Sequence, residues 1–259
     1  MISALIVALA TCLTVDGADR VLAPGTATLF GELHGTNEAP AFVANVLCLA
    51  AAQHVPVTLG VELPSESTAT LNRYVKSSGG AADTASLLAD AAWHMTPQDG
   101  RTSEAMLALF ERARTLVANG ADVDVFAFSE TAPTGQQRDE LMAGNIARKI
   151  ASDPRRAMIV LTGNIHSRVA IGTGFDPSYR PMGYLLRALV PDTRVVGLNV
   201  SYDAGTAWMC LSGEPTCGAH AVKGQRQIAL NAVELSHANA AYDGAYGVSA
   251  LTASKPAVQ

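Results

Sequence analysis

Short apolar runs alternate with longer segments of helical periodicity along most of this chain. Five apolar runs have the length and residue types of buried strands: 27–33, 55–63, 123–130, 157–164 and 193–202. The spacing of apolar positions between and after them predicts helices over 37–54, 65–78, 102–120, 135–153 and 182–190. This alternation is typical of βαβ units, so the sequence predicts an α/β protein with a mainly parallel central sheet flanked by helices.

Two segments depart from the alternation. Residues 77–101 are rich in small side chains and fit neither one strand nor one clean helix, so we expect a small helical insertion there. After residue 235 the periodicity is lost, and we expect a loosely held tail. Because 259 residues with 49% hydrophobic content can bury one large core, residues 20–259 are predicted to form a single α/β domain.

The first residues, MISALIVALATCLTV, have the length of the hydrophobic region of a signal peptide and are too short to span a bilayer comfortably. A polar, turn-rich segment follows at once, so residues 1–19 are predicted to be a leader. A buried first strand is the alternative. Cys12 lies in a weak lipidation context, and no integral membrane span is expected in the mature chain.

The chain has four cysteines, and two of them flank a short turn. Cys210 and Cys217 enclose LSGEPT, where Gly and Pro favour a turn that brings the sulfurs together, so a hairpin disulfide is predicted. A disulfide agrees with a periplasmic or secreted location. Two unpaired thiols in a cytosolic protein are the alternative.

Charge limits the class of partner. The formal net charge is -5, and no run of Lys or Arg forms a basic stripe. The electrostatic footprint of a nucleic-acid-binding protein is therefore missing, and nucleic acid is excluded as a partner.

Polar side chains gather where the predicted strands end. Four of the five strands run into titratable or hydroxyl groups: Glu32 and His34, Glu62, Ser129 and Glu130, and Asn164 and His166. Ligands of open α/β sheets bind outside the carboxyl ends of the strands, so these groups are predicted to share one crevice. Two of the four ends carry the same G-x-x-H pattern, which favours a site over isolated structural residues.

The predicted helix over 135–153 adds a cation. Arg138 and Asn145 lie seven residues apart, on one helix face with Met142. This face is predicted to point inward, where a guanidinium could bind a carboxylate or an oxyanion and where Asn145 could contact substrate. The alternative is a solvated Arg138 paired with Asp139 or Glu140.

The insertion supplies three further candidates. Trp93, His94 and Arg101 are predicted to face the crevice as part of the substrate wall, and an ordinary packed corner is the alternative. The chain has no G-x-S-x-G elbow, H-E-x-x-H motif, phosphate-binding Walker loop or G-x-G-x-x-G after the first strand. A water nucleophile, activated by a histidine or a metal, therefore fits the residues better than a covalent serine mechanism.

Four motifs occur in a recognisable order: GELHGTNEAPAF, GVELP, RDELMAGNIARKI and VLTGNIHSR. In that order they resemble the EreA/ChaN-like superfamily, which includes the erythromycin esterases, the haem-binding ChaN lipoproteins and the Tiki proteases. The resemblance covers about residues 28–170. The helix motif and His166 follow the esterase pattern, whereas the spacing from Glu32 to His34 is one residue shorter than in the esterases and nearer to the ChaN and Tiki form.

The resemblance implies an α/β fold with a site built from five residues: Glu32, His34, Glu62, Arg138 and His166. Its first functional interpretation is a hydrolase of an ester, lactone or amide in a small-molecule or peptide substrate. His34 or His166 would take a proton from water, Glu32 or Glu62 would orient that histidine, and Arg138 would stabilise the oxyanion.

Two cofactor hypotheses accompany this interpretation. Glu32, His34, Glu62 and His166 could hold a divalent metal, although Arg138 is an unfavourable neighbour for one. The alternative function is an exported haem- or metal-binding protein of the ChaN type. Its candidate axial ligands are Tyr74, His94, Met95, Tyr179 and Tyr184.

Overall fold

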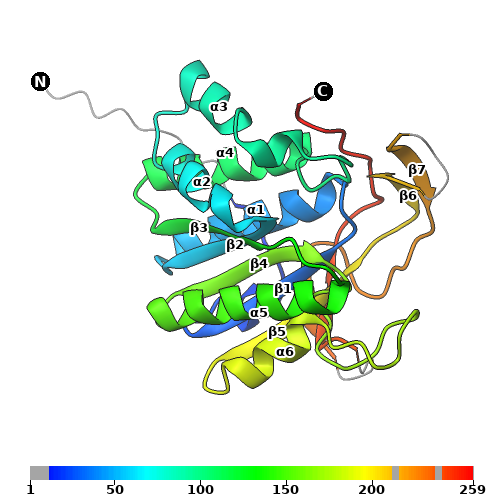
Figure 1. Cartoon of the computed structure of the whole chain (residues 1–259). Helices are drawn as coiled ribbons and strands as arrows, with labels where there is room; N and C mark the ends of the chain where they lie inside the picture. Colours follow the sequence, from blue (N-terminus) through cyan, green and yellow to red (C-terminus); the bar gives the residue numbers. More distant parts are fainter. Residues whose placement is uncertain (1–11, 212–215, 237–240, 259) are drawn as a thin grey trace, which may run out of the picture.

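A seven-stranded sheet forms the centre of this computed structural model, which describes residues 12–211, 216–236 and 241–258 (Figure 1). The strand order is β3-β2-β4-β1-β5-β9-β8. The bounds are β1 Thr26–Glu32, β2 Val57–Pro64, β3 Val123–Ser129, β4 Ala157–Gly163, β5 Arg194–Ser201, β8 Val233–Leu235 and β9 Gly244–Gly247. All neighbouring pairs are parallel except β8 with β9, so the predicted α/β fold with a mainly parallel sheet is confirmed.

Helices cover both faces of the sheet (Figure 1). They are α1 Glu38–Ala52, α2 Thr68–Val75, α3 Ala81–Leu88, α4 Glu104–Ala118, α5 Gly135–Ser152 and α6 Met182–Leu189. Leu29 of β1 packs into the core on the α5 and α6 side, and the next residue, Phe30, packs into the core on the α1 and α4 side. Successive side chains of a strand point to opposite faces of the sheet, and helices bury both faces. The strands are therefore apolar at every position and not only at alternate ones.

The segment predicted as a small helical insertion contains α3 and a short 3-10 helix, Ala91–His94. Trp93 of this helix is only 1% exposed and lies with its ring centroid 6.2 Å from that of Phe110 in α4. The indole therefore anchors the insertion to the core. The prediction that Trp93 forms part of a substrate wall is wrong, because a side chain this deeply buried cannot contact substrate.

The end of the chain is held more firmly than its sequence suggests. β9 pairs with β5 in the main sheet, and Tyr246 of β9 is fully buried, with its ring 5.3 Å from that of Phe30. Beyond β9, Ala253 and Pro256 form bridges with Thr36 and Ser103. The expectation of a loose tail is therefore wrong for the described part of this segment. Backbone pairing holds it in place, and such pairing produces no periodic pattern of side chains in the sequence.

Two disulfides are present among the described residues. Cys210–Cys217 is the predicted one. Cys12–Cys48 was not predicted, and it ties the start of the described chain to α1, while Asp16 pairs with Ala232 beside β8. Residues 1–11 of the predicted leader lie outside the described residues, but residues 12–19 belong to the folded unit. The boundary expected at residue 19 is therefore placed too late, and Cys12 is bonded to Cys48 instead of being free for lipidation.

A separate two-stranded sheet, β6 Gly205–Met209 and β7 Gly218–Val222, extends from the end of β5 (Figure 1). It is antiparallel, with Trp208 opposite Ala219. None of the helices in residues 12–211, 216–236 and 241–258 is long and apolar enough to cross a membrane.

Candidate active site

The four strands predicted to carry the site are neighbours in the order β3-β2-β4-β1. Their carboxyl ends therefore lie side by side. Glu32 ends β1, Glu62 lies near the end of β2, Ser129 ends β3, and His166 follows β4 by three residues. The contacts described below show that the structure brings these groups into one cluster.

Glu62 is the centre of the cluster. Its Oε2 accepts hydrogen bonds from the Thr162 hydroxyl at 2.7 Å and from the Gly163 backbone N–H at 2.8 Å. Its Oε1 accepts one from Nη2 of Arg138 at 2.7 Å. Burial by itself would raise the pKa of this carboxyl, but the neighbouring His166, His34 and Arg138 side chains hold its pKa well below the usual value. Glu62 is therefore a buried, fixed negative charge.

His34 lies between two carboxylates. Its Nδ1 is 2.9 Å from Oε1 of Glu32, and its Nε2 is 3.6 Å from Oε2 of Glu62. Burial disfavours the charged imidazolium, but the Glu62 charge and the hydrogen bond with Glu32 outweigh it and raise the pKa of His34 to about 10. Both ring nitrogens face acceptors, which is the arrangement that a doubly protonated imidazolium requires. His34 is thus a cation at neutral pH.

Glu32 completes this pair at the end of β1. The carboxylate is 4% exposed, and burial raises its pKa, opposed by the hydrogen bond with His34. Among the described residues, its Oε2 has no hydrogen-bond partner. The motif GELHGTNEAPAF therefore places a carboxylate and an imidazole together, and one oxygen of that carboxylate can accept a hydrogen bond from another donor.

His166 lies between groups of opposite charge. Its Nδ1 is 2.6 Å from Oδ1 of Asp139, a residue with no exposed surface. Its Nε2 is 3.4 Å from Nη1 of Arg138 and 3.7 Å from Oε1 of Glu62. The guanidinium is a donor only, so the Arg138 contact favours a lone pair on Nε2, while the Asp139 carboxylate favours the proton on Nδ1. Nε2 of His166 thus faces a donor, Arg138, as well as a carboxylate, Glu62.

Arg138 reaches the site from the first turns of α5. Besides Glu62, its Nη2 donates to the Ser129 hydroxyl at 2.8 Å. The alternative pairing with its sequence neighbours is not found, because Asp139 contacts His166 and Glu140 pairs with Arg180. The face of α5 that carries Arg138 therefore points inward, as its spacing with Met142 predicts.

Asn145 lies on the same face of α5 but has a different environment. Its amide donates to the Phe128 carbonyl at 3.1 Å and to the Glu130 carboxylate at 2.8 Å. The side chain thus fixes the end of β3 and orients Glu130. A direct contact between Asn145 and substrate stays a prediction.

Glycines allow the close approach of these groups. A Cβ atom on Gly163 would lie 3.0 Å from Nε2 of His34 and 3.4 Å from Cδ2 of His166. A Cβ atom on Gly31 would lie 2.0 Å from the Ser167 hydroxyl. The two G-x-x-H motifs therefore share a physical reason, since each glycine makes room for a group on the neighbouring strand end.

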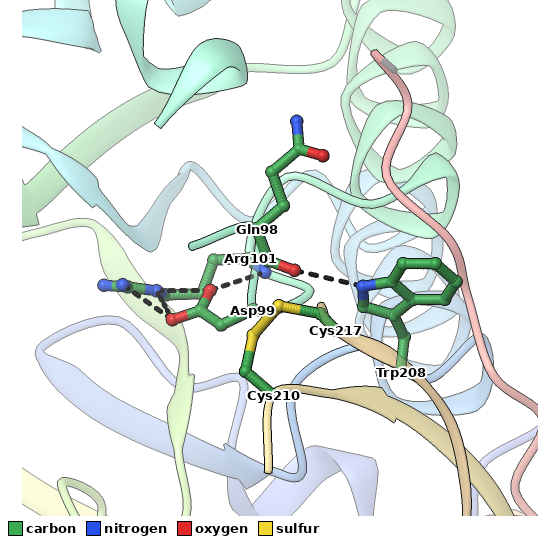
Figure 2. Close-up of a disulfide and its surroundings, with 6 residues drawn as sticks. All are labelled: Gln98, Asp99, Arg101, Trp208, Cys210 and Cys217. Atoms are coloured by element: carbon green, nitrogen blue, oxygen red, sulfur yellow. Dashed lines mark hydrogen bonds and ion pairs between the residues drawn. A yellow bond between two sulfur atoms is a disulfide. The ribbon is translucent and has the colours of Figure 1, made fainter. Parts of the chain in front are cut away.

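The insertion contributes Arg101 to the cluster. Its Nη1 is 3.7 Å from Oε1 of Glu62, and Asp99 holds its Nε and Nη2 at 3.0 and 2.8 Å (Figure 2). His94, in contrast, is exposed, and its Nε2 lies 2.9 Å from the Leu88 carbonyl within the insertion itself. Of the three predicted wall residues, only Arg101 has a contact with the charged cluster.

A pocket of about 400 Å³ opens beside the two guanidiniums. It is lined by Pro64, Glu66, Met95, Arg101, Ser129, Glu130, Thr131, Ala132 and Arg138. Volumes of this size accommodate small molecules, and a few convergent polar groups within such a pocket are typical of binding sites.

The cofactor hypotheses gain no support from the geometry. Among the described residues, no group of three or more His, Cys, Asp and Glu could hold a metal ion. Of the candidate haem ligands, the Tyr74 hydroxyl donates to Glu111. Burial of the Tyr179 hydroxyl, followed by the charge of Asp139, raises the Tyr179 pKa. No described contact gathers these residues around one cavity.

Sequence reasoning missed Asp139, Thr162 and Asp99. Each acts on another site residue: Asp139 on His166, Thr162 on Glu62, and Asp99 on Arg101. The available signal was adjacency, because Asp139 directly follows Arg138 in the RDELMAGNIARKI motif. Adjacency alone favours a pairing of Asp139 with Arg138, whereas the fold turns Asp139 toward His166.

No protein-family model matches the sequence, and no curated protein matches it. Solved structures do. Erythromycin esterase EreC, solved as a mutant in its open conformation, is 11% identical, with 89% of this chain and 92% of that chain covered at a TM-score of 0.65. A Bacillus cereus protein is also 11% identical, with 92% and 91% covered at a TM-score of 0.56. ChaN of Campylobacter jejuni, solved with cofacial haem, is 13% identical, with 71% and 84% covered at a TM-score of 0.43.

At these identities the similarity shows the fold and not the activity. The ChaN match, with its low TM-score, supports no conclusion about this chain. The chain shares the fold of the erythromycin esterase EreC, which belongs to the group of proteins that the four sequence motifs resemble.

Proposed function

We propose that this chain is a hydrolase that uses a histidine-activated water to cleave an ester, lactone or amide bond. The observation that carries the proposal is the unequal environment of the two histidines around Glu62. Each histidine lies between two carboxylates, one of which is Glu62. Only His166 has a guanidinium at Nε2 as well, with Nη1 of Arg138 at 3.4 Å. Because a guanidinium only donates, its contact with Nε2 of His166 favours a lone pair on that nitrogen, which a general base needs.

His166 is the base in this proposal. Its Nε2 accepts a proton from water, and the oxygen of that water attacks the carbonyl carbon of the substrate. Asp139 at 2.6 Å from Nδ1 stabilises the imidazolium that forms. When the tetrahedral intermediate collapses, the leaving alcohol or amine takes the same proton back from Nε2, so the cycle balances.

The cations of the site stabilise the oxyanion. Arg138 and the His34 imidazolium are held by the fixed carboxylates Glu62 and Glu32, so their orientation exists before substrate binds. Preorganised charge of this kind typically contributes about 10² to 10³ in rate for each donor. Arg101, which also lines the pocket, is placed to bind a carbonyl or carboxylate group of the substrate.

The pocket supports a small-molecule substrate or a short peptide, since its volume is about 400 Å³. The two disulfides support a periplasmic or secreted location, because such bonds persist in oxidising compartments. No described contact favours the haem-binding alternative.

The test is turnover of a panel of esters, lactones and amides by the purified chain, with His166→Asn and His34→Asn as variants. We expect about a 10²- to 10⁴-fold loss for His166→Asn. The matched control is His54→Asn, at an exposed histidine with a φ of 53°, a conformation that Asn tolerates. Hydrolysis in ¹⁸O-water should place one labelled oxygen in the acid product.

Full turnover by a folded His166→Asn protein would exclude His166 as the base. Loss of turnover after dialysis against a chelator, with recovery on adding a divalent ion, would contradict the metal-independent chemistry proposed here.

A further inference from the structure

The β6–β7 hairpin lies outside the main sheet but contacts both loops that bring site residues into place. Trp208 of β6 makes two backbone-directed hydrogen bonds. Its indole Nε1 donates to the Gln98 carbonyl at 3.0 Å (Figure 2). Its backbone N–H donates to the Gly35 carbonyl at 2.9 Å. One residue of the hairpin thus bridges two segments that are far apart in the sequence, with its side chain on one and its backbone on the other.

These two segments also touch each other through glycines. A Cβ atom on Gly100 would lie 2.4 Å from the Gly35 backbone, and one on Gly35 would lie 2.1 Å from the Trp208 carbonyl. Both glycines have a positive φ, which is +72° for Gly35 and +97° for Gly100. The three backbones are therefore stacked without room for side chains, so a shift of one is transmitted to the others.

Each segment carries a group of the charged cluster. Gly35 directly follows His34, and Gly100 lies between Asp99 and Arg101. Gly35 is also held by the Ser254 N–H, at 2.8 Å, so the tail and the hairpin share its carbonyl. The Gln98 segment, in contrast, is bound to the hairpin by the indole itself.

The Cys210–Cys217 disulfide closes the free end of this hairpin, directly beyond Trp208 and Met209. A two-stranded sheet is marginally stable in water without further support, and a disulfide restricts the open state. Cys210 is exposed, whereas Cys48 of the second disulfide is 3% exposed. A reductant in solution therefore has direct access to the hairpin disulfide and poor access to Cys12–Cys48.

We propose that Trp208 is a positioning residue for the active site, and that the Cys210–Cys217 disulfide holds the hairpin that carries it. Trp208 acts through Gly35 on His34 and through Gln98 on the Asp99–Arg101 pair. Its effect on hydrolysis rests on the proposed function, but its effect on the two loops does not.

Amide hydrogen exchange of the whole chain without substrate tests the positioning role directly. The first variant is Trp208→Phe, which keeps an aromatic ring but loses the Nε1 donor. We expect about fivefold faster exchange in a peptide covering 97–101, the effect of one lost hydrogen bond. A smaller increase is expected in a peptide covering 33–36, because the backbone bond to Gly35 remains and only its packing against Gly100 is disturbed. The second measurement uses the native chain treated with dithiothreitol, which converts the disulfide to two thiols as the reagent forms its cyclic disulfide. The same two peptides should exchange faster.

The matched control is Trp93→Phe, at a buried tryptophan of the insertion that packs on Phe110 instead of the hairpin. It should leave exchange at 33–36 unchanged. Where turnover is measurable, Trp208→Phe should lower kcat about tenfold or more with less than a twofold change in KM, because misplaced catalytic groups slow the chemical step.

Unchanged exchange in both peptides, for Trp208→Phe and for the reduced chain, would overturn the proposal. A chain that hydrolyses no tested substrate, yet shows the faster exchange, would contradict the proposed function and leave the positioning role supported.

Discussion

Arg138 and Glu62 form an ion pair, 2.7 Å from Nη2 to Oε1, between the first turns of α5 and the end of β2, with the carboxylate buried and the guanidinium half-buried. The pair joins one helical face to the sheet at the point where the two histidines meet. Glu62 is 4% exposed, and the same carboxylate is also bound by Thr162 and Gly163. The contact therefore fixes both the cation and the carboxylate around which the site is built.

Removing this cation should destabilise the protein. Arg138→Met leaves the Glu62 charge buried with one partner fewer, and breaking a buried pair in this way costs about 3 kcal/mol. The control is Arg180→Met, which breaks the more exposed pair with Glu140 and should cost less than about 1 kcal/mol. Urea unfolding of the two variants measures the difference, and equal losses would contradict a special role for Arg138.

The charge of His34 predicts a pH dependence of stability. Its pKa in the folded protein is raised from 6.5 to about 10. A raised pKa contributes stability that is fully present below about pH 6.5 and is lost as the pH rises toward 10. The free energy of unfolding should therefore fall across this window, and His34→Asn should have a flatter profile. Identical profiles for both proteins would show that His34 is not held as a cation.

The same charge predicts the basic limb of the activity profile. Because the imidazolium of His34 stabilises the oxyanion in the proposed mechanism, kcat/KM should decline as the pH approaches about 10. Glu62→Gln removes the largest favourable charge near His34, so the limb should move to lower pH. The measurement is a pH–rate profile on one ester, and an unmoved limb would assign it to another group.

A single methyl group tests the packing of the two histidines. Gly163→Ala places a Cβ atom 3.0 Å from Nε2 of His34, so that ring must move by a few tenths of an ångström. We expect a folded protein with a kcat lowered about tenfold, because small displacements of catalytic groups slow the chemistry. Gly120→Ala is not a suitable control because of its positive φ, whereas Gly174 has open space around its Cβ position and serves as one. Equal kcat values for Gly163→Ala and Gly174→Ala would contradict the tight arrangement.

The Cys12–Cys48 disulfide should act on stability alone. It spans 36 residues, for which restriction of the unfolded chain contributes about 3 to 4 kcal/mol. The double variant Cys12→Ser and Cys48→Ser should therefore unfold at lower urea concentration. Its kcat should stay within twofold of the native value, because no described contact joins this disulfide to the charged cluster. A large fall in kcat in the folded variant would contradict this separation.

The sequence by itself determined the main strands and helices, because apolar periodicity reports which faces are buried. It also determined that Glu32, His34, Glu62 and His166 lie near one another, since parallel strands with their crossover helices end at the same edge of the sheet. The family motifs supported the same set with Arg138. The Cys210–Cys217 pair could be predicted because its turn residues lie between the two cysteines.

Only the tertiary structure decided which partner each group meets. His34 and His166 have the same local motif, and both contact Glu62, yet His34 pairs with Glu32 and His166 with Asp139 and Arg138. Trp93 and Arg101 come from one insertion, but one is in the core and the other near Glu62. These differences depend on contacts between distant segments, such as Trp208 with Gln98, and such contacts leave no periodic signal in the sequence.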